Sequence, residues 1–269
     1  MNRIILIPIL FFVTSIYSQD YIVKSESDTL FCEIVYTKAN GLNYIAQSSD
    51  SIEYLGLEEF STYFKSYDKF RLGISGGYGY RPIEISGYPT GLESYAKGIK
   101  SGINVGLDFS YSTSAVVAYG IKYSLFLSNN SKDNFNYVDS LGNPINTGPV
   151  KNNIQIHYIG PTLSTRAPIG KRRFLIELSL GYLYYREKAI VIEPMTITGG
   201  TFGMNINLQY EVSISEKFAV GIMGGVQLGT LEELKYNYGT HSELFKAENP
   251  EDYDSLIRYD LTLTFRMRK

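Results

Sequence analysis

The sequence predicts an all-β protein, an eight-stranded antiparallel transmembrane β-barrel preceded by a small β-rich N-terminal module. The first observation is that every second residue from Phe202 to Ile214 is apolar or aromatic, with polar residues or glycine between. A strand places two such sets on opposite faces, whereas a helix would mix them. The second is length: runs of about a dozen residues exceed the usual 5–6 of soluble strands and suit a tilted membrane span of about 9–11. One apolar and one polar face are typical of a transmembrane barrel.

The composition agrees with a barrel and excludes several other classes. The chain has 24 tyrosines, 25 glycines and no tryptophan, and tyrosine suits the boundary between membrane and water. A mean hydropathy of -0.10 argues against a helical membrane protein with many spans. The net charge of -2 gives no indication of a nucleic-acid partner. Two histidines and one cysteine leave little for a metal cluster or a disulfide framework, so we expect no metal and no cofactor.

Residues 1–18 are interpreted as a secretory signal peptide. Arg3 supplies the positive start, an apolar run covers Ile4–Val13, and a cleavage site precedes Gln19. The run is shorter than the roughly 20 residues of a membrane-spanning helix. The alternatives are an N-terminal anchor or a buried strand.

Residues 19–66 are predicted to form a small β-rich module. Turn residues separate four candidate strands, and residues 57–64 suit either a short helix or a last strand. About 45 residues bury little surface, so we expect a plug-like or spacer module that leans on the barrel or on a partner. Cys32 is expected to be a small buried hydrophobe. The candidate strands are Tyr21–Lys24, Thr29–Thr37, Leu42–Gln47 and Ser51–Leu55.

Residues 67–269 are predicted to form the barrel. Each span alternates an apolar outer set with a polar inner set, and the fourth is the least regular. There we expect Ile154, Ile156 and Tyr158 to face out and His157 to face the lumen. The predicted spans are Phe70–Arg81, Gly98–Tyr111, Ala115–Ser128, Asn153–Thr165, Phe174–Glu187, the two strands of the hairpin Thr201–Gly229, and Ser255–Arg268.

The connections between these spans alternate in length. Long ones, at 82–97, 129–152, 188–200 and 230–254, are separated by short turns. Barrels of the outer membrane have an even number of strands, short periplasmic turns and longer external loops. We therefore expect the four long loops outside and both termini in the periplasm. The alternative is a soluble β-sandwich, whose apolar faces would meet in a core.

Charged residues on the inner faces are expected to form a salt-bridge and hydrogen-bond network in the lumen. An eight-stranded barrel is only wide enough for side chains to fill, and an unpaired charge there would be strongly destabilising. The alternative is a narrow path for ions or protons. The predicted network contains Arg71, Lys100, Asp108, Lys122, Glu177, Glu211, Arg258, Asp260 and Arg266.

Two weaker patterns lie in the fourth long loop. His241-Ser242-Glu243 suggests lipid-A-modifying enzymes, but adjacent residues alone do not make a nucleophile and base of good geometry, so no catalytic residue is assigned. The acidic residues of 232–254 match no calcium-loop spacing. A solvated loop is favoured over a divalent-cation site.

The barrel resembles a family of small outer-membrane β-barrel proteins of Bacteroidota, of the OmpA/OmpX-like and PorT-like type. Tyr158–Pro161 and the Gly/Tyr-rich strands carry the resemblance, and Ser27–Ile34 with Ile52–Tyr54 is similar to a module often fused to such barrels. The chain departs from the family at Phe265–Lys269, which lacks the usual terminal aromatic residue. The resemblance transfers no functional residue.

The resemblance and the residue pattern together predict a non-enzymatic structural or partner-binding role in the outer membrane of a Gram-negative bacterium, with the N-terminal module in the periplasm. The expected partners are outer-membrane lipid, lipopolysaccharide and another envelope or secretion protein. A lipid-A-modifying enzyme and a narrow channel remain the alternatives.

Overall fold

The computed structural model describes residues 20–25, 28–46, 49, 51–64, 68–83, 92–114, 116–138, 144–169, 172–191, 193–215, 217–249 and 253–268. The chain divides into two compact units, residues 1–67 and 68–269, and each is described by itself. The signal peptide predicted for residues 1–18 lies outside the described residues.

The N-terminal unit is one antiparallel sheet with the strand order β4-β3-β2-β1-β5. Its core contains Ile22, Ile34, Leu42 and Cys32. Burial raises the pKa of the Cys32 thiol to about 11, with a smaller contribution from Asp20, so the residue behaves as a buried hydrophobe and not as a reactive thiolate. The elements are β1 (Tyr21–Ser25), β2 (Asp28–Lys38), β3 (Gly41–Ala46), β4 (Glu53–Gly56), the 3₁₀ turn η1 (Leu57–Glu59) and β5 (Thr62–Phe64).

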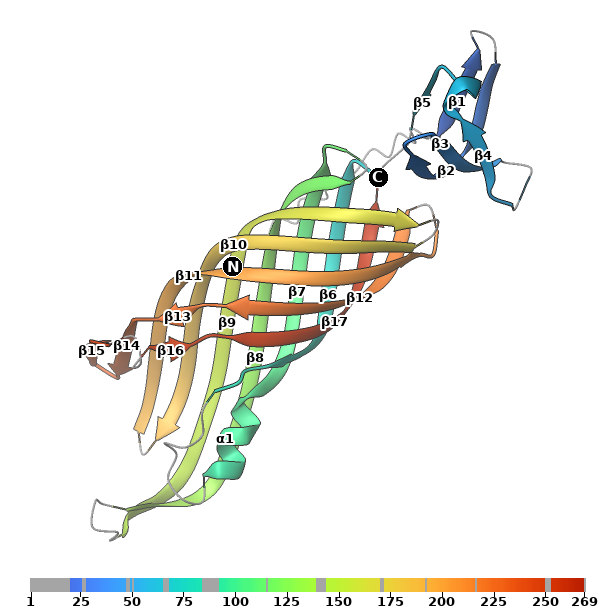
Figure 1. Ribbon diagram of the computed structural model, residues 1–269. Coiled ribbons are helices and arrows are strands. Elements are labelled where there is room, and N and C mark those ends of the chain that lie inside the picture. The colour runs from blue at the N-terminus through green and yellow to red at the C-terminus, as the bar shows by residue number, and fades with distance from the viewer. Residues whose placement is uncertain are drawn as a thin grey trace, which may run out of the picture. The chain divides into compact units, whose positions relative to one another are not determined.

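The second unit is a closed antiparallel barrel of eight strands, which confirms the predicted fold class. Each strand pairs with its neighbour along the chain, and pairing between β6 and β17 completes the ring (Figure 1). The barrel strands are β6 (Phe70–Tyr80), β7 (Ser101–Ser112), β8 (Val117–Val138), β9 (Pro144–Ile169), β10 (Arg172–Val191), β11 (Glu193–Ser213), β12 (Phe218–Leu228) and β17 (Arg258–Arg268).

The side chains of β17 show how the two faces differ. Arg258 and Thr262 are 0% and 2% exposed, whereas Leu261 and Leu263 are 62% and 69% exposed. The apolar set therefore points away from the protein, and the polar set fills the interior. A soluble sandwich would show the opposite arrangement, so that alternative is wrong.

The barrel is asymmetric, which corrects two of the predicted long loops. Strands β8 to β11 contain 22, 26, 20 and 21 residues, whereas β6, β12 and β17 contain 11 each. Most of the predicted loop 129–152 is strand, and the described residues of the predicted loop 188–200 belong to β10 and β11, which pair as far as Val191 and Glu193. In Figure 1 these four strands run on beyond the shorter ones.

The other two predicted loops contain secondary structure as well. The predicted loop 82–97 contains the start of the helix α1 (Glu93–Ile99), so Gly98 and Ile99 belong to that helix and not to the second span. Residues 230–254 contribute β13 (Thr230–Leu231), β14 (Glu233–Tyr238), β15 (His241–Lys246) and β16 (Asp254–Ser255). Strand β14 pairs with β11 and widens the extended sheet. Within the described part of the chain, no helix has both the length and the apolar character needed to cross a membrane.

Candidate functional site

A cluster of paired charges fills the barrel interior near the end at which β7 joins β8, β9 joins β10 and β11 joins β12. This end is called the turn end below, and the opposite end is called the upper end. Arg71 Nη2 lies 2.5 Å from Glu211 Oε1, and Arg266 Nε lies 2.7 Å from the same carboxylate oxygen. Arg266 also pairs with Asp108. The side chains of Arg71, Glu211 and Arg266 are at most 3% exposed. The Glu211 carboxylate thus pairs with two buried guanidinium groups, and Asp108 supplies the second negative charge that balances them.

Glycine makes room for the pair between Arg266 and Asp108. Gly73 lies opposite both residues in the register, between β7 and β17. A Cβ atom at Gly73 would lie 2.4 Å from Asp108 Oδ2 and 2.6 Å from Arg266 Nη1. The absence of a side chain at this position therefore lets Arg266 reach across β6 to its partner.

A second set of contacts continues the network along the lumen. Lys122 Nζ lies 3.1 Å from Glu177 Oε1, which also accepts a hydrogen bond of 2.9 Å from Asn207. Gln209 Nε2 donates to Glu211 and Thr264, both at 2.8 Å, and its carbonyl oxygen accepts from Arg266. These amides add hydrogen bonds to the buried charges, and Gln209 joins Glu211, Arg266 and Thr264.

Farther from the turn end, Arg258 lies between the charged network and a second, apolar cluster of buried side chains, which is called the plug below. Its Nε donates to Asp260 Oδ1 at 2.7 Å, and its guanidinium carbon lies 5.0 Å from the ring centroid of Phe126. Such a cation–π contact is strengthened when both groups are shielded from water. The plug comprises the buried residues Leu92, Tyr95, Ile99, Phe126, Tyr137, Val150, Ile154, Ile156, Tyr158, Leu183, Tyr185, Ile197, Leu231, Leu234 and Leu256.

Eight of the nine predicted network residues thus lie in the lumen and pair with one another. The exception is Lys100, which lies at the C-terminal end of α1, before β7 begins, and takes part in none of the ion pairs of the described residues. Its placement on a strand was wrong because the helical turn of Tyr95 to Ile99 interrupts the apparent alternation.

The fourth span had its faces reversed in the prediction. Ile154, Ile156 and Tyr158 are 2%, 0% and 0% exposed and belong to the plug. His157 lies on the outer face, between Tyr123 and Tyr184, and its Nδ1 lies 2.9 Å from the Tyr123 hydroxyl. The error arose because this part of the lumen is apolar whereas the outer face has Gln155 and His157, so the alternation is present but its sense is opposite to that of the lower barrel.

Sequence reasoning also missed a cluster at the turn end of the barrel. Asp68, just before β6, pairs with Arg173 and lies 3.5 Å from Arg268 Nη1. Burial alone would raise the pKa of Asp68, but the guanidinium groups of Arg173 and Arg268 outweigh this effect and hold the pKa below its ordinary value of 3.8. Asp68 and Arg173 are 105 positions apart in the sequence, so no local pattern marks them as partners.

We expect the Asp68 carboxylate to make stability depend on pH. Because its pKa is lowered in the folded state, its contribution is complete above pH of about 3.8 and is lost as the pH falls through the lower folded value. Asp68→Asn should therefore lower the unfolding temperature in detergent at neutral pH, and the gap to the wild type should close in acid. An Asp133→Asn variant, changed at an exposed site, serves as the control. A gap that stays constant with pH would contradict the assignment.

The outer face of the barrel has an apolar band between two sets of aromatic side chains. On β10, the ten residue steps from Phe174 to Tyr184 span about 34 Å of strand, or about 26 Å along the membrane normal at a tilt of about 40°. This matches the apolar band of about 25 Å in outer-membrane barrels. The turn-end girdle comprises Phe70, Phe109, Tyr111, Tyr119, Phe174, Tyr210, Phe218 and Phe265, and the upper girdle Tyr78, Tyr80, Tyr123, Tyr182, Tyr184, Phe202 and Tyr259.

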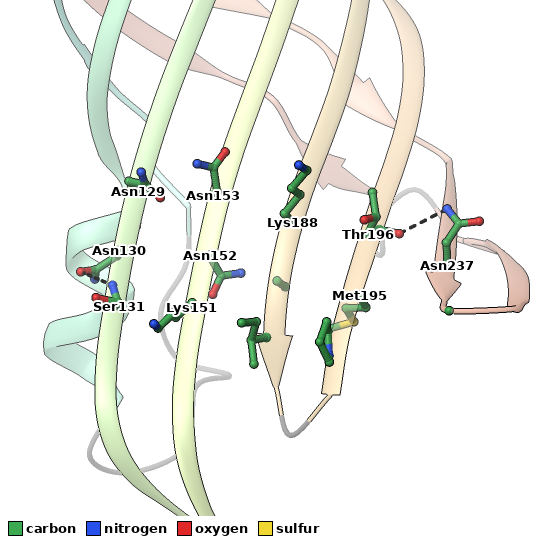
Figure 2. A pocket seen from close by; sticks show the side chains of 14 residues that line it. Asn129, Asn130, Ser131, Lys151, Asn152, Asn153, Lys188, Met195, Thr196 and Asn237 are labelled. Atoms are coloured by element: carbon green, nitrogen blue, oxygen red, sulfur yellow. Dashed lines mark hydrogen bonds between the residues drawn. The ribbon is translucent and has the colours of Figure 1, made fainter.

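A polar groove lies on the extended sheet beyond the upper girdle. Its volume is about 960 Å³, and Figure 2 shows its side chains arrayed along neighbouring strands. Asn237 of β14 donates to the carbonyl oxygen of Thr196 on β11, which ties the edge strand to the groove. The lining residues are Asn129, Asn130, Ser131, Lys151, Asn152, Asn153, Lys188, Ala189, Ile190, Pro194, Met195, Thr196, Asn237 and Gly239.

The closed antiparallel barrel, its buried polar interior and its exposed apolar band define a transmembrane β-barrel protein of the outer-membrane type. No protein-family model matches the chain, and no curated protein matches it significantly. The described residues include no group of three or more His, Cys, Asp or Glu side chains placed to hold a metal ion.

Several solved structures are similar. Neisserial surface protein A is 7% identical, with 75% of this chain and 97% of that chain covered and a TM-score of 0.44. A major outer-membrane protein of Thermus thermophilus is 9% identical, with 76% and 100% covered and a TM-score of 0.49. The attachment protein Ail of Yersinia pestis is 12% identical, with 74% and 99% covered and a TM-score of 0.40. These identities transfer no residue role, and the conclusions about this chain rest on its own geometry.

Proposed function

We propose that this chain is an outer-membrane protein of a Gram-negative bacterium with a structural and partner-binding role, and that it neither conducts nor catalyses. The observation that carries the proposal is the filled interior. Arg71 and Arg258 are among the largest fully buried side chains, and Phe126, Tyr158 and Leu183 are each 0% exposed. A water-filled path along the lumen would expose these groups, so the geometry favours a sealed barrel.

An enzymatic role has little support from the one catalytic pattern in the sequence. His241 and Ser242 are consecutive residues of β15, opposite Tyr238 and Asn237 in the register with β14. Consecutive side chains on a strand point to opposite faces, so His241 is not placed to take a proton from Ser242. This geometry favours a solvated hairpin over a lipid-A-modifying site.

The surfaces left for interaction lie outside the lumen. The extended strands β8 to β11 continue past the upper girdle, where they meet the anionic lipid and lipopolysaccharide of the outer leaflet in the proposed orientation. The N-terminal module is then periplasmic, available to another envelope or secretion protein. The barrel anchors both surfaces, which is a role that needs no open pore.

Planar-bilayer recording tests the sealed barrel. The purified protein should give a conductance indistinguishable from that of the bare bilayer, because paired charges and the apolar plug occupy the lumen at two levels. Heat-modifiable migration on a gel establishes that the same preparation is folded. Stable single-channel steps would refute the proposal. Lipid A whose mass changes on expression of the protein would favour the enzyme instead.

A further inference from the structure

The outer face of β8 to β11 changes character abruptly just beyond the upper girdle. Two consecutive cross-strand rows belong to the girdle, Tyr123-Ile159-Tyr182-Phe202 and then Leu125-His157-Tyr184-Gly200. The next rows are Leu127-Gln155-Arg186-Thr198-Lys235, Asn129-Asn153-Lys188-Thr196-Asn237 and Ser131-Lys151-Ile190-Pro194. Residues directly opposite one another on neighbouring strands share a face, so all these side chains continue the surface that contacts lipid below.

The three upper rows are basic and contain no acidic residue. Their charged members are Lys151, Arg186, Lys188 and Lys235. Among the described residues, no carboxylate oxygen lies within ion-pair distance of any of these four cations. The intervening Glu187 points the other way and is 8% exposed. The outer face therefore has four positive charges without an ion-pair partner among the described residues, spread over three successive rows of the sheet.

Between these charges lie side-chain amides and hydroxyls that both donate and accept hydrogen bonds. Residues of both faces line the polar groove, and its outer-face members include Asn129, Asn153 and Thr196 together with Lys151 and Lys188 (Figure 2). The groove volume of about 960 Å³ falls within the range of about 300–1000 Å³ found for small-molecule sites. Lysine is a point charge suited to phosphate, and amides and hydroxyls suit sugar hydroxyls.

We propose that this groove binds the phosphorylated sugar headgroup of a lipid-A-type glycolipid of the outer leaflet. The proposal rests on the outer-membrane location given above. The apolar band below the girdle contacts acyl chains, and Tyr123, His157 and Tyr184 mark the depth at which these chains end. A headgroup attached to such chains lies at the level of the basic rows. A soluble anion would contact only the basic rows. Because the basic rows are continuous with the apolar band below them, a ligand with both acyl chains and a phosphorylated headgroup fits this face better.

Native mass spectrometry of the detergent-solubilised barrel tests the proposal, with bisphosphorylated lipid A and its dephosphorylated form as probes. The wild type should bind the bisphosphorylated form more tightly, and this binding should weaken at high salt. The variant Lys151→Gln, Arg186→Gln, Lys188→Gln should bind it about a hundredfold more weakly. Each Lys or Arg next to an anionic lipid surface contributes about fivefold.

A matched control removes three exposed cations from the opposite end of the barrel: Lys69→Gln, Arg172→Gln, Lys217→Gln. This variant should bind bisphosphorylated lipid A as the wild type does. Equal wild-type binding of the two lipid forms, insensitivity to salt, or equal losses in the two triple variants would overturn the proposal. The comparison of the two lipid forms on the wild-type protein tests the proposal even if a variant misfolds. A folded, non-conducting barrel without lipid preference would refute this inference alone, whereas a conducting barrel would refute the proposed function alone.

Discussion

Replacing Glu211 by leucine is expected to lower the free energy of unfolding by about 3–5 kcal/mol, the usual cost of breaking a buried ion pair. Arg71 then loses its 2.5 Å partner, and Asp108 is the one acidic partner that Arg266 retains among the described residues. Gln209 also loses one hydrogen-bond acceptor. The reason for the size of the effect is that the guanidinium of Arg71 stays buried without a counter-charge. Urea unfolding from lipid vesicles, followed by tyrosine fluorescence, measures the change.

The matched control is Glu193→Leu, the same substitution at an exposed position on the same strand. It should change the free energy of unfolding by less than about 0.5 kcal/mol. The double variant Arg71→Met, Glu211→Leu should recover part of the loss, because it removes the orphaned charge together with its partner. Equal effects of Glu211→Leu and Glu193→Leu would show that Glu211 is not a buried partner.

The inner and outer faces of most barrel strands were predictable because the two faces have different surroundings. Where one face meets hydrocarbon and the other a charged lumen, alternation assigns every side chain, as in Arg258 to Met267 on β17. The same argument placed Arg71, Glu177 and Glu211 inside. It could not supply their partners. Arg71 and Glu211 are 140 positions apart and come together only when the ring of strands has closed.

Prediction failed where that contrast is inverted or disappears. Around Ile154 to Tyr158 the alternation has the opposite sense: the apolar residues face the interior, and Gln155 and His157 face out. Only the pairing of β9 with β8 and β10 sets which face is inside. Beyond the upper girdle both faces become polar, so Asn129, Lys151 and Asn153 have the composition of a loop although they continue β8 and β9. Backbone hydrogen bonds between neighbouring strands stabilise the strand conformation there. Such pairing does not depend on an alternation of apolar and polar side chains, so the sequence does not show it.

A single arginine at two positions of one strand tests where the membrane ends. Leu180 is 62% exposed on the outer face of β10, midway between Phe174 and Tyr184. Leu180→Arg should lower the free energy of unfolding from lipid vesicles by about 2–4 kcal/mol, the cost of a lipid-facing charge at the bilayer midplane. The cost arises because no water or acid on that face can solvate the guanidinium.

The partner variant Ile190→Arg places the same side chain on the same strand and the same face, among the basic rows above the girdle. There the expected cost falls to about 0–1 kcal/mol, because the side chain reaches water or lipid phosphate. The ratio of the two effects locates the hydrocarbon boundary between these positions. Equal costs would place it elsewhere, and they would remove the physical basis for a headgroup at the level of Lys188, since acyl chains would then extend past it.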